Sequence, residues 1–154
     1  GMVMWILIGA ACFTRFYMGM GAAHLVEDMV MASRLSPWAV LIMMQLSLML
    51  LGMIMDDYAV VLIAAPIYTP IIVALGFNPL WFGILFLVNL QIAYLTPPYG
   101  FALFYMKGLV SDKGVPMSEV WHSILPFIPL QIFGLALVMI FPQLALWLPG
   151  LIFN

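Results

Sequence analysis

The chain has 154 residues, of which 67% are apolar, and only four Lys or Arg and six Asp or Glu side chains give it a net charge of −2. Because about a quarter of the residues in a soluble domain are charged, this composition and a mean hydropathy of +1.22 exclude a soluble globular domain. They also exclude a nucleic-acid-binding protein, which needs a basic surface, whereas a single cysteine excludes a disulfide framework. We therefore expect a helical protein that crosses the lipid bilayer several times.

The charged residues divide the chain into segments. The first segment, 1–35, is expected to hold a membrane helix at about 2–20 and a polar connector at 21–35. Two apolar helices follow over 36–76 and another membrane helix over 77–107. The last segment, 108–154, is expected to hold a second connector and a last helix at about 120–148. Strands of a membrane barrel are not expected, because the apolar runs are continuous and do not alternate. Since the chain is apolar from its start, we expect it to be the C-terminal part of a longer protein.

The segment 36–76 has two possible topologies. Ser36-Pro37 is typical of the start of a helix, as an N-cap followed by proline at the first helical position. On one interpretation the segment crosses the membrane twice, with Asp56-Asp57 in a surface loop. On the other it is a re-entrant hairpin, whose arms of about 26 to 28 Å fall short of a bilayer core of about 30 Å. Pro66 and Pro70 break backbone hydrogen bonds in the second arm, which favours the hairpin.

The following segment contains a helix break at Thr96-Pro97-Pro98-Tyr99-Gly100. The two prolines lack N–H donors, so the carbonyls of Ala93 and Tyr94 lose their usual helical partners. Asn89, Ala93 and Thr96 lie at i, i+4 and i+7, on the face that leads into the break. Amide, hydroxyl and carbonyl oxygens together form an environment suited to an alkali cation. The alternative is a proline kink with two polar side chains that bridge neighbouring helices.

Several motifs together resemble a known family, the large membrane subunit of tripartite ATP-independent periplasmic (TRAP) transporters. The matching residues are Gly52-Met-Ile-Met-Asp56, Pro66-Ile-Tyr-Thr-Pro70, Leu75 to Gly83, Asn89, Leu95 to Gly100, and Phe141 to Pro149. The resemblance covers essentially the whole chain and is greatest to the mannitol/chloroaromatic-compound branch. This chain departs from many relatives at Asp57, where they have Pro, at Ala93, where they have Gly, and at Tyr99, where they have Val.

The resemblance implies an all-α, polytopic membrane protein. It implies that this chain is the second inverted repeat of an elevator-type transporter, with a re-entrant hairpin over 36–76 and a discontinuous helix over 77–107. It further implies a multi-pass protein of the bacterial inner membrane that imports an organic acid or similar small solute. The expected partners are a small TRAP membrane subunit and a periplasmic solute-binding subunit, with sodium as the coupling ion and no other cofactor.

The residues and the resemblance together predict a sodium site between the hairpin tip and the helix break. Asp56 needs a counter-ion if it lies at membrane depth, because no Lys or Arg occurs in the surrounding apolar block. The expected cation- or solute-binding residues are Gly52, Asp56, Asn89, Ala93, Thr96, Pro97, Pro98 and Gly100, and Asp56, Asn89 and Thr96 are the expected sodium ligands.

Two functions from other classes remain open. A structural membrane subunit without its own substrate site is the main alternative. An intramembrane aspartyl protease is disfavoured, because the intramembrane acids form one dipeptide, whereas that mechanism needs two carboxylates from facing elements. We therefore expect a transporter component and not an enzyme.

Overall fold

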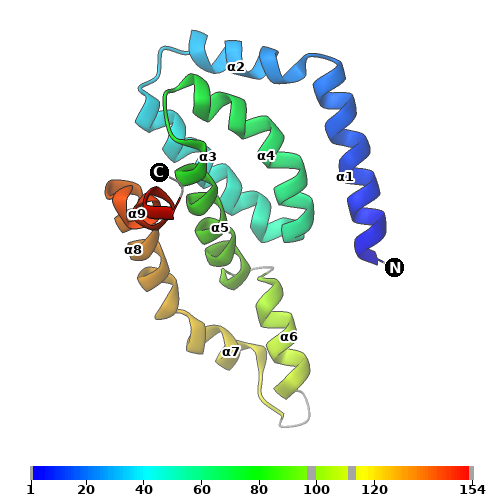
Figure 1. Cartoon of the computed structure of the whole chain (residues 1–154). Helices are drawn as coiled ribbons and strands as arrows, with labels where there is room; N and C mark the ends of the chain where they lie inside the picture. Colours follow the sequence, from blue (N-terminus) through cyan, green and yellow to red (C-terminus); the bar gives the residue numbers. More distant parts are fainter. Residues whose placement is uncertain (1, 97–99, 111–113, 153–154) are drawn as a thin grey trace.

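The computed structural model describes residues 2–96, 100–110 and 114–152, and the secondary structure in these ranges is helical (Figure 1). The helices are α1 (Met2–Gly19), α2 (Ala22–Ala32), α3 (Pro37–Ile54), α4 (Asp57–Ala74), α5 (Pro79–Leu95), α6 (Phe101–Val110), α7 (Met117–Ile124), α8 (Phe127–Ile140) and α9 (Gln143–Ile152). The all-α fold class is thereby confirmed.

Three segments are long and apolar enough to cross a membrane. They are Pro37–Ile54, Asp57–Ala74 and Met117–Ile140, and α1 with α2 would add a fourth span that bends by 65° at its break. Large apolar side chains such as Trp5, Ile42 and Leu130 lie exposed on the outside of these helices. A surface of this kind is typical of a protein that lipid surrounds.

Local sequence signals fix the helix starts around the central hairpin. The Ser36 side chain accepts a hydrogen bond from the N–H of Ala39, and Pro37 follows it at the first position of α3. The Asn78 side chain accepts from the N–H groups of Leu80 and Trp81, and Pro79 opens α5 in the same way. Both caps satisfy N–H groups that a helix start leaves without partners. The helix start predicted at Ser36-Pro37 is confirmed.

Gly76 ends the second arm of the hairpin. It adopts a left-handed φ of 81°, and its N–H bonds the carbonyl of Val73 while the N–H of Phe77 bonds the carbonyl of Ile72. This is a Schellman motif, in which glycine allows the chain to reverse after a helix. The turn brings α5 back against the two arms.

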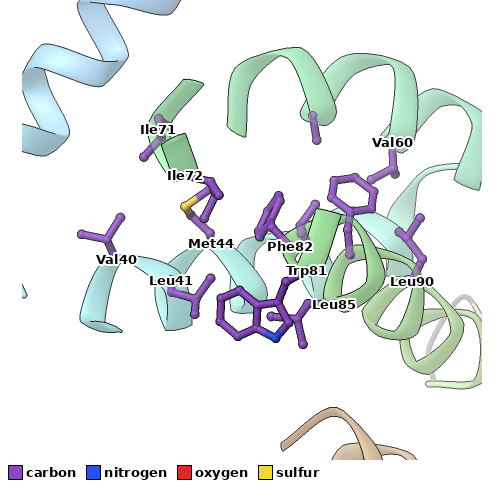
Figure 2. Packing of buried hydrophobic residues seen from close by; sticks show 13 residues of the cluster. Val40, Leu41, Met44, Val60, Ile71, Ile72, Trp81, Phe82, Leu85 and Leu90 are labelled. Atoms are coloured by element: carbon purple, nitrogen blue, oxygen red, sulfur yellow. The ribbon is translucent and has the colours of Figure 1, made fainter. Parts of the chain in front are cut away.

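The apolar core lies between the arms of the hairpin and α5. Figure 2 shows Trp81, Phe82 and Leu85 of α5 among side chains of α3 and α4. The members of this cluster are Val40, Leu41, Met44, Leu48, Val60, Ala64, Ile71, Ile72, Trp81, Phe82, Leu85, Phe86 and Leu90. The Trp81 Nε1–H donates to the Val138 carbonyl of α8 at 2.8 Å, so α8 is held on the other side of α5.

Pro66 and Pro70 lie inside α4, and the helix continues through both. Because Pro66 has no N–H, the carbonyl of Leu62 lacks its helical donor. The Thr14 hydroxyl of α1 donates to that carbonyl at 3.0 Å. A side chain from a neighbouring helix thus restores the backbone bond, as is usual for proline in membrane helices, and it ties the second arm to α1.

The predicted connector at 21–35 is wrong in part, because most of it forms α2. Gly21 takes a left-handed φ of 70° and turns the chain after α1. The residues that follow are mainly helix formers, and Val26 and Val30 pack against the core. The few charged residues of this segment are compatible with an amphipathic helix that packs on the hairpin.

The predicted last helix at about 120–148 is also corrected. Its start agrees with the Pro116 and Ser118 signals in the sequence, because α7 begins at Met117 with Pro116 at the N-cap, and α7 and α8 together form one apolar segment of 24 residues. The helix then breaks at Phe141, whose ψ of 79° is not helical. Pro142 disfavours the helical conformation of the residue before it, and α9 therefore begins as a separate helix.

Candidate functional site

The hairpin tip is a two-residue turn between α3 and α4. Met55 and Asp56 are both extended, and Asp56 occupies the N-cap position of α4. Asp57 follows in the first turn of α4. Two carboxylates at a helix start face the positive end of the helix dipole, which stabilises negative charge there.

The end of α3 touches α5 through two small residues. A Cβ atom placed on Gly52 would lie 2.8 Å from the Cβ of Ala93 and 3.1 Å from Cδ2 of Leu90. Both Gly52 and Ala93 are buried. The structure thus brings together two of the predicted site residues from separate motifs, and only glycine fits at position 52.

Asn89 lies one helical turn before Ala93 and is paired with a residue that sequence reasoning missed. Its Nδ2 donates to the side-chain Oε1 of Gln45 at 2.6 Å and to the Gln45 carbonyl at 2.8 Å. Gln45 and Asn89 are 4% and 3% exposed. A signal for Gln45 exists in the sequence, since it is an uncharged polar side chain in an apolar span at i−7 from Gly52, on the same face of α3.

The helix break begins at Thr96. The Thr96 hydroxyl donates to the Ile92 carbonyl at 2.7 Å, and the Thr96 N–H donates to the Ala93 carbonyl at 3.2 Å. The expectation that the Ala93 carbonyl has no helical partner is therefore corrected, because a tighter i to i+3 bond replaces the lost one. A carbonyl oxygen has two lone pairs, so it can still accept a second bond.

Gly100 closes the break from the other side. A Cβ atom at Gly100 would lie 2.6 Å from the Tyr94 carbonyl oxygen and 3.2 Å from the Thr96 carbonyl oxygen. Two backbone oxygens therefore converge where only glycine leaves room. The predicted site residues Pro97 and Pro98 lie outside the described residues.

Two side-chain oxygens of the predicted site residues are buried and unpartnered within the described part of the chain. They are Oδ2 of Asp56 and Oδ1 of Asn89. Nε2 of Gln45 is a buried donor in the same condition. Buried polar atoms are nearly always satisfied by a partner, a water molecule or an ion, so these oxygens can receive a cation or a polar solute atom. No hydrogen bond joins the described side chains of Asp56 and Thr96.

The hairpin tip and the helix break form an oxygen-rich zone. It combines a carboxylate at a helix N-terminus and backbone carbonyls at a helix break, with the Asn89 amide oxygen further along α5. Hard oxygen donors of this kind suit alkali cations, and irregular backbone inside a membrane protein is typical of sites that handle ions or solutes.

Comparison with known proteins identifies the family. Residues 1–144 match the family described as "Tripartite ATP-independent periplasmic transporter, DctM component". The chain is 31% identical to the C4-dicarboxylate TRAP transporter large permease protein DctM of Pseudomonas aeruginosa, over 97% of this chain and 34% of that protein. It is 36% identical to the sialic acid TRAP transporter large permease protein SiaM of Vibrio cholerae, over 75% of this chain and 26% of that protein.

A third relative is the isethionate TRAP transporter permease protein DctMQ of Oleidesulfovibrio alaskensis, with 34% identity over 73% of this chain and 17% of that protein. The chain thus spans about a third or less of the length of these relatives. The match covers the first membrane helix, the hairpin, the broken helix and most of the last span. The chain therefore belongs to the DctM family of large permease subunits of tripartite ATP-independent periplasmic transporters.

Proposed function

We propose that this chain contributes one half of the transport path of a sodium-coupled permease. The permease imports an organic acid or similar small solute that a periplasmic binding protein delivers, and a small membrane subunit completes the assembly. The names of the relatives support this class of solute, since they refer to C4-dicarboxylates, sialic acid and isethionate. Coupling to sodium would supply about 2.3 kcal/mol for each charge that moves down 100 mV.

The observation that carries the proposal is the buried, unpartnered Oδ2 of Asp56 at the hairpin tip. The tip follows Gly52, which rests on Ala93, so it lies near the end of α5 that leads into the break at Thr96. Asn89 carries a second unpartnered oxygen, but it pairs with Gln45, on the other side of the Gly52–Ala93 contact. Leaving a buried acceptor unsatisfied costs about 1 to 3 kcal/mol. A sodium ion bound by Asp56, Thr96 and the carbonyls near Gly100 would satisfy the Asp56 oxygen.

The experiment uses the full-length permease assembled with its small subunit. Binding of radioactive sodium is measured for Asp56→Asn, Thr96→Ala and the unmodified protein. Both variants are expected to weaken sodium affinity by roughly tenfold or more, because each removes a charged or polar ligand. Asp28→Asn and Thr69→Ala are matched controls, since both side chains are exposed on α2 and α4 and lie outside the proposed site.

The result also separates the transporter from a purely structural subunit. A permease that binds sodium normally in both site variants, while the assembly with the small subunit persists, would refute this location for the ion. A full-length protein with no sodium binding at all would favour the structural subunit.

A further inference from the structure

A mainly apolar groove with three polar lining residues lies next to the proposed sodium site. Its volume is about 440 Å³, and it runs between the start of α4, the C-terminal half of α5 and the start of α6. Its polar lining consists of Asp57, Gln91 and Tyr94, and apolar side chains such as Val61 and Leu87 line the rest. Gln91 and Tyr94 lie on different faces of α5 from Asn89 and Ala93, whereas Asp57 is the direct neighbour of Asp56 and joins the groove to the proposed sodium site.

Asp57 is the centre of this groove. Its Oδ1 accepts a hydrogen bond from the N–H of Tyr58 at 2.9 Å, and the Tyr94 phenol hydrogen-bonds the Asp57 side chain. These contacts hold the carboxylate at the N-terminal end of α4, against α5. A carboxylate offers about four acceptor positions, so these contacts leave capacity for donors from a solute.

The charge of the groove limits what can enter it. Between residues 35 and 106 the sequence contains two charged side chains, Asp56 and Asp57, and no Lys or Arg. The described lining of the groove contains no Lys or Arg, and one sodium ion at Asp56 would still leave the Asp56–Asp57 pair with a net negative charge. A solute carboxylate in the groove would therefore be repelled, and unpaired charge away from water is costly. A hydroxyl or ammonium group would instead donate a charge-assisted hydrogen bond to Asp57.

We propose that this groove receives the hydrogen-bond-donating end of the transported solute, a hydroxyl or ammonium group, and that Asp57 keeps carboxylates out of it. The inference rests on the proposed transport function and adds the chemistry of one end of the solute. Gln91 supplies an amide that can donate to or accept from the same end. An anionic group of the same solute binds outside this groove.

The first test measures the electrostatic selectivity of the groove. Gln91→Cys is introduced into the full-length permease after its native cysteines, including the exposed Cys12, are replaced. Modification rates are measured with a trimethylammonium-ethyl and a sulfonato-ethyl methanethiosulfonate, each corrected for its rate with a free thiol. We expect the cationic reagent to react on the order of tenfold faster, and Asp57→Asn to abolish this preference.

Asp28→Asn is the matched control and leaves the preference unchanged, because Asp28 is exposed on α2 and does not line the groove. If Asp57→Asn does not fold, Tyr94→Phe is measured in its place. This variant keeps the charge of Asp57 and should keep the preference for the cationic reagent. Equal rates for the two reagents, no reaction with either, or a preference that survives Asp57→Asn would overturn the proposal.

The second test identifies the class of donor with three six-carbon probes. Gluconate carries hydroxyls, 6-aminohexanoate an ammonium group and adipate a second carboxylate. Gluconate or 6-aminohexanoate is expected to slow the modification of Gln91→Cys at least about threefold, and adipate is not; which of the two protects distinguishes hydroxyl from ammonium recognition. Protection by adipate, or by none of the probes, overturns the assignment. Sodium binding to the same protein reports on the proposed function separately.

Discussion

Gly52 lies in close contact with the broken helix. Its missing side chain lets the end of α3 rest on Ala93, and a Cβ there would lie 2.8 Å from the Cβ of Ala93. Both atoms belong to rigid helical backbone and neither has a flexible end that can move away. The contact therefore sets the position of the hairpin tip, and with it the position of Asp56, relative to α5.

We predict that Gly52→Ala disrupts the proposed sodium site. Overpacking of a rigid contact costs about 1 to 3 kcal/mol, which corresponds to a loss of sodium affinity on the order of tenfold, measured by binding of radioactive sodium. Ala93→Gly in the same protein removes the opposing methyl group and should restore most of the affinity. Gly83→Ala is the control, because nothing lies within 4 Å of a Cβ at Gly83. Normal affinity in Gly52→Ala would show that the contact does not position the ion.

The sequence could indicate some of these residues individually but not their relation. Gly52, Asn89, Ala93 and Gly100 can be selected from motifs and helical spacing. Gln45 cannot be selected with the same certainty, because its importance depends on a partner 44 residues away. The converging carbonyls at Gly100 follow from the path of the backbone through the break, which proline and glycine permit without determining.

At the scale of elements, the arms of the hairpin are fastened to different neighbours. The first arm, α3, is joined to α5 by the Gln45–Asn89 pair. The second arm, α4, is joined to α1 by the bond from Thr14 to the Leu62 carbonyl. The Ser47 and Tyr68 hydroxyls lie 2.7 Å apart and join the two arms to each other. Because buried bonds of this kind fix helix register in apolar surroundings, α3 and α5 should behave as one unit.

A double-mutant cycle on Gln45 and Asn89 tests this coupling. Gln45→Leu and Asn89→Leu should each destabilise the full-length protein by about 1 to 3 kcal/mol, because each leaves the other amide buried without its partner. The double variant should be more stable than the sum of the single effects predicts, as measured by thermal unfolding in detergent. Gln143→Leu, at an exposed position of α9, is the control for the change from amide to leucine. Additive effects would show that the two amides do not act as a pair.

Helix boundaries were predictable where short motifs determine them. Ser36-Pro37 and Asn78-Pro79 each carry a cap and a proline in sequence, and the structure places helix starts at both. Helix α2 was missed because its charged residues resemble a connector, although its apolar residues pack on the hairpin. The break at Phe141 was missed because a continuous apolar run conceals it, and the conformational effect of Pro142 on the preceding residue decides the local structure.

At the scale of the whole molecule, this chain is part of a multi-pass protein of the bacterial inner membrane. It spans 34% of the Pseudomonas aeruginosa relative, and many large apolar side chains on its outer helices are exposed. Sites of transporters built from repeats lie at the interface between the repeats. The oxygen-rich zone and the groove described above are therefore proposed as one wall of such a site.

The topology of the hairpin is the last prediction, and it decides whether Asp56 lies at membrane depth. Each arm has 18 residues, which is about 27 Å and slightly less than a bilayer core of about 30 Å. Ser36 and Gly76 are exposed at the outer ends of the arms, so cysteines at both positions should react with a membrane-impermeant reagent from the same side. That result fits a re-entrant hairpin and also two complete crossings, and labelling at the tip must separate them.

The tip is tested with a cysteine at position 56 in the assembled transporter. We expect at least one state of the transporter in which this cysteine does not react from the opposite side, because a re-entrant tip ends inside the protein. Constant reaction from that side, with and without sodium, would mean that the arms cross the membrane completely. Asp56 would then be a surface residue, and the counter-ion that a buried carboxylate requires would no longer be needed.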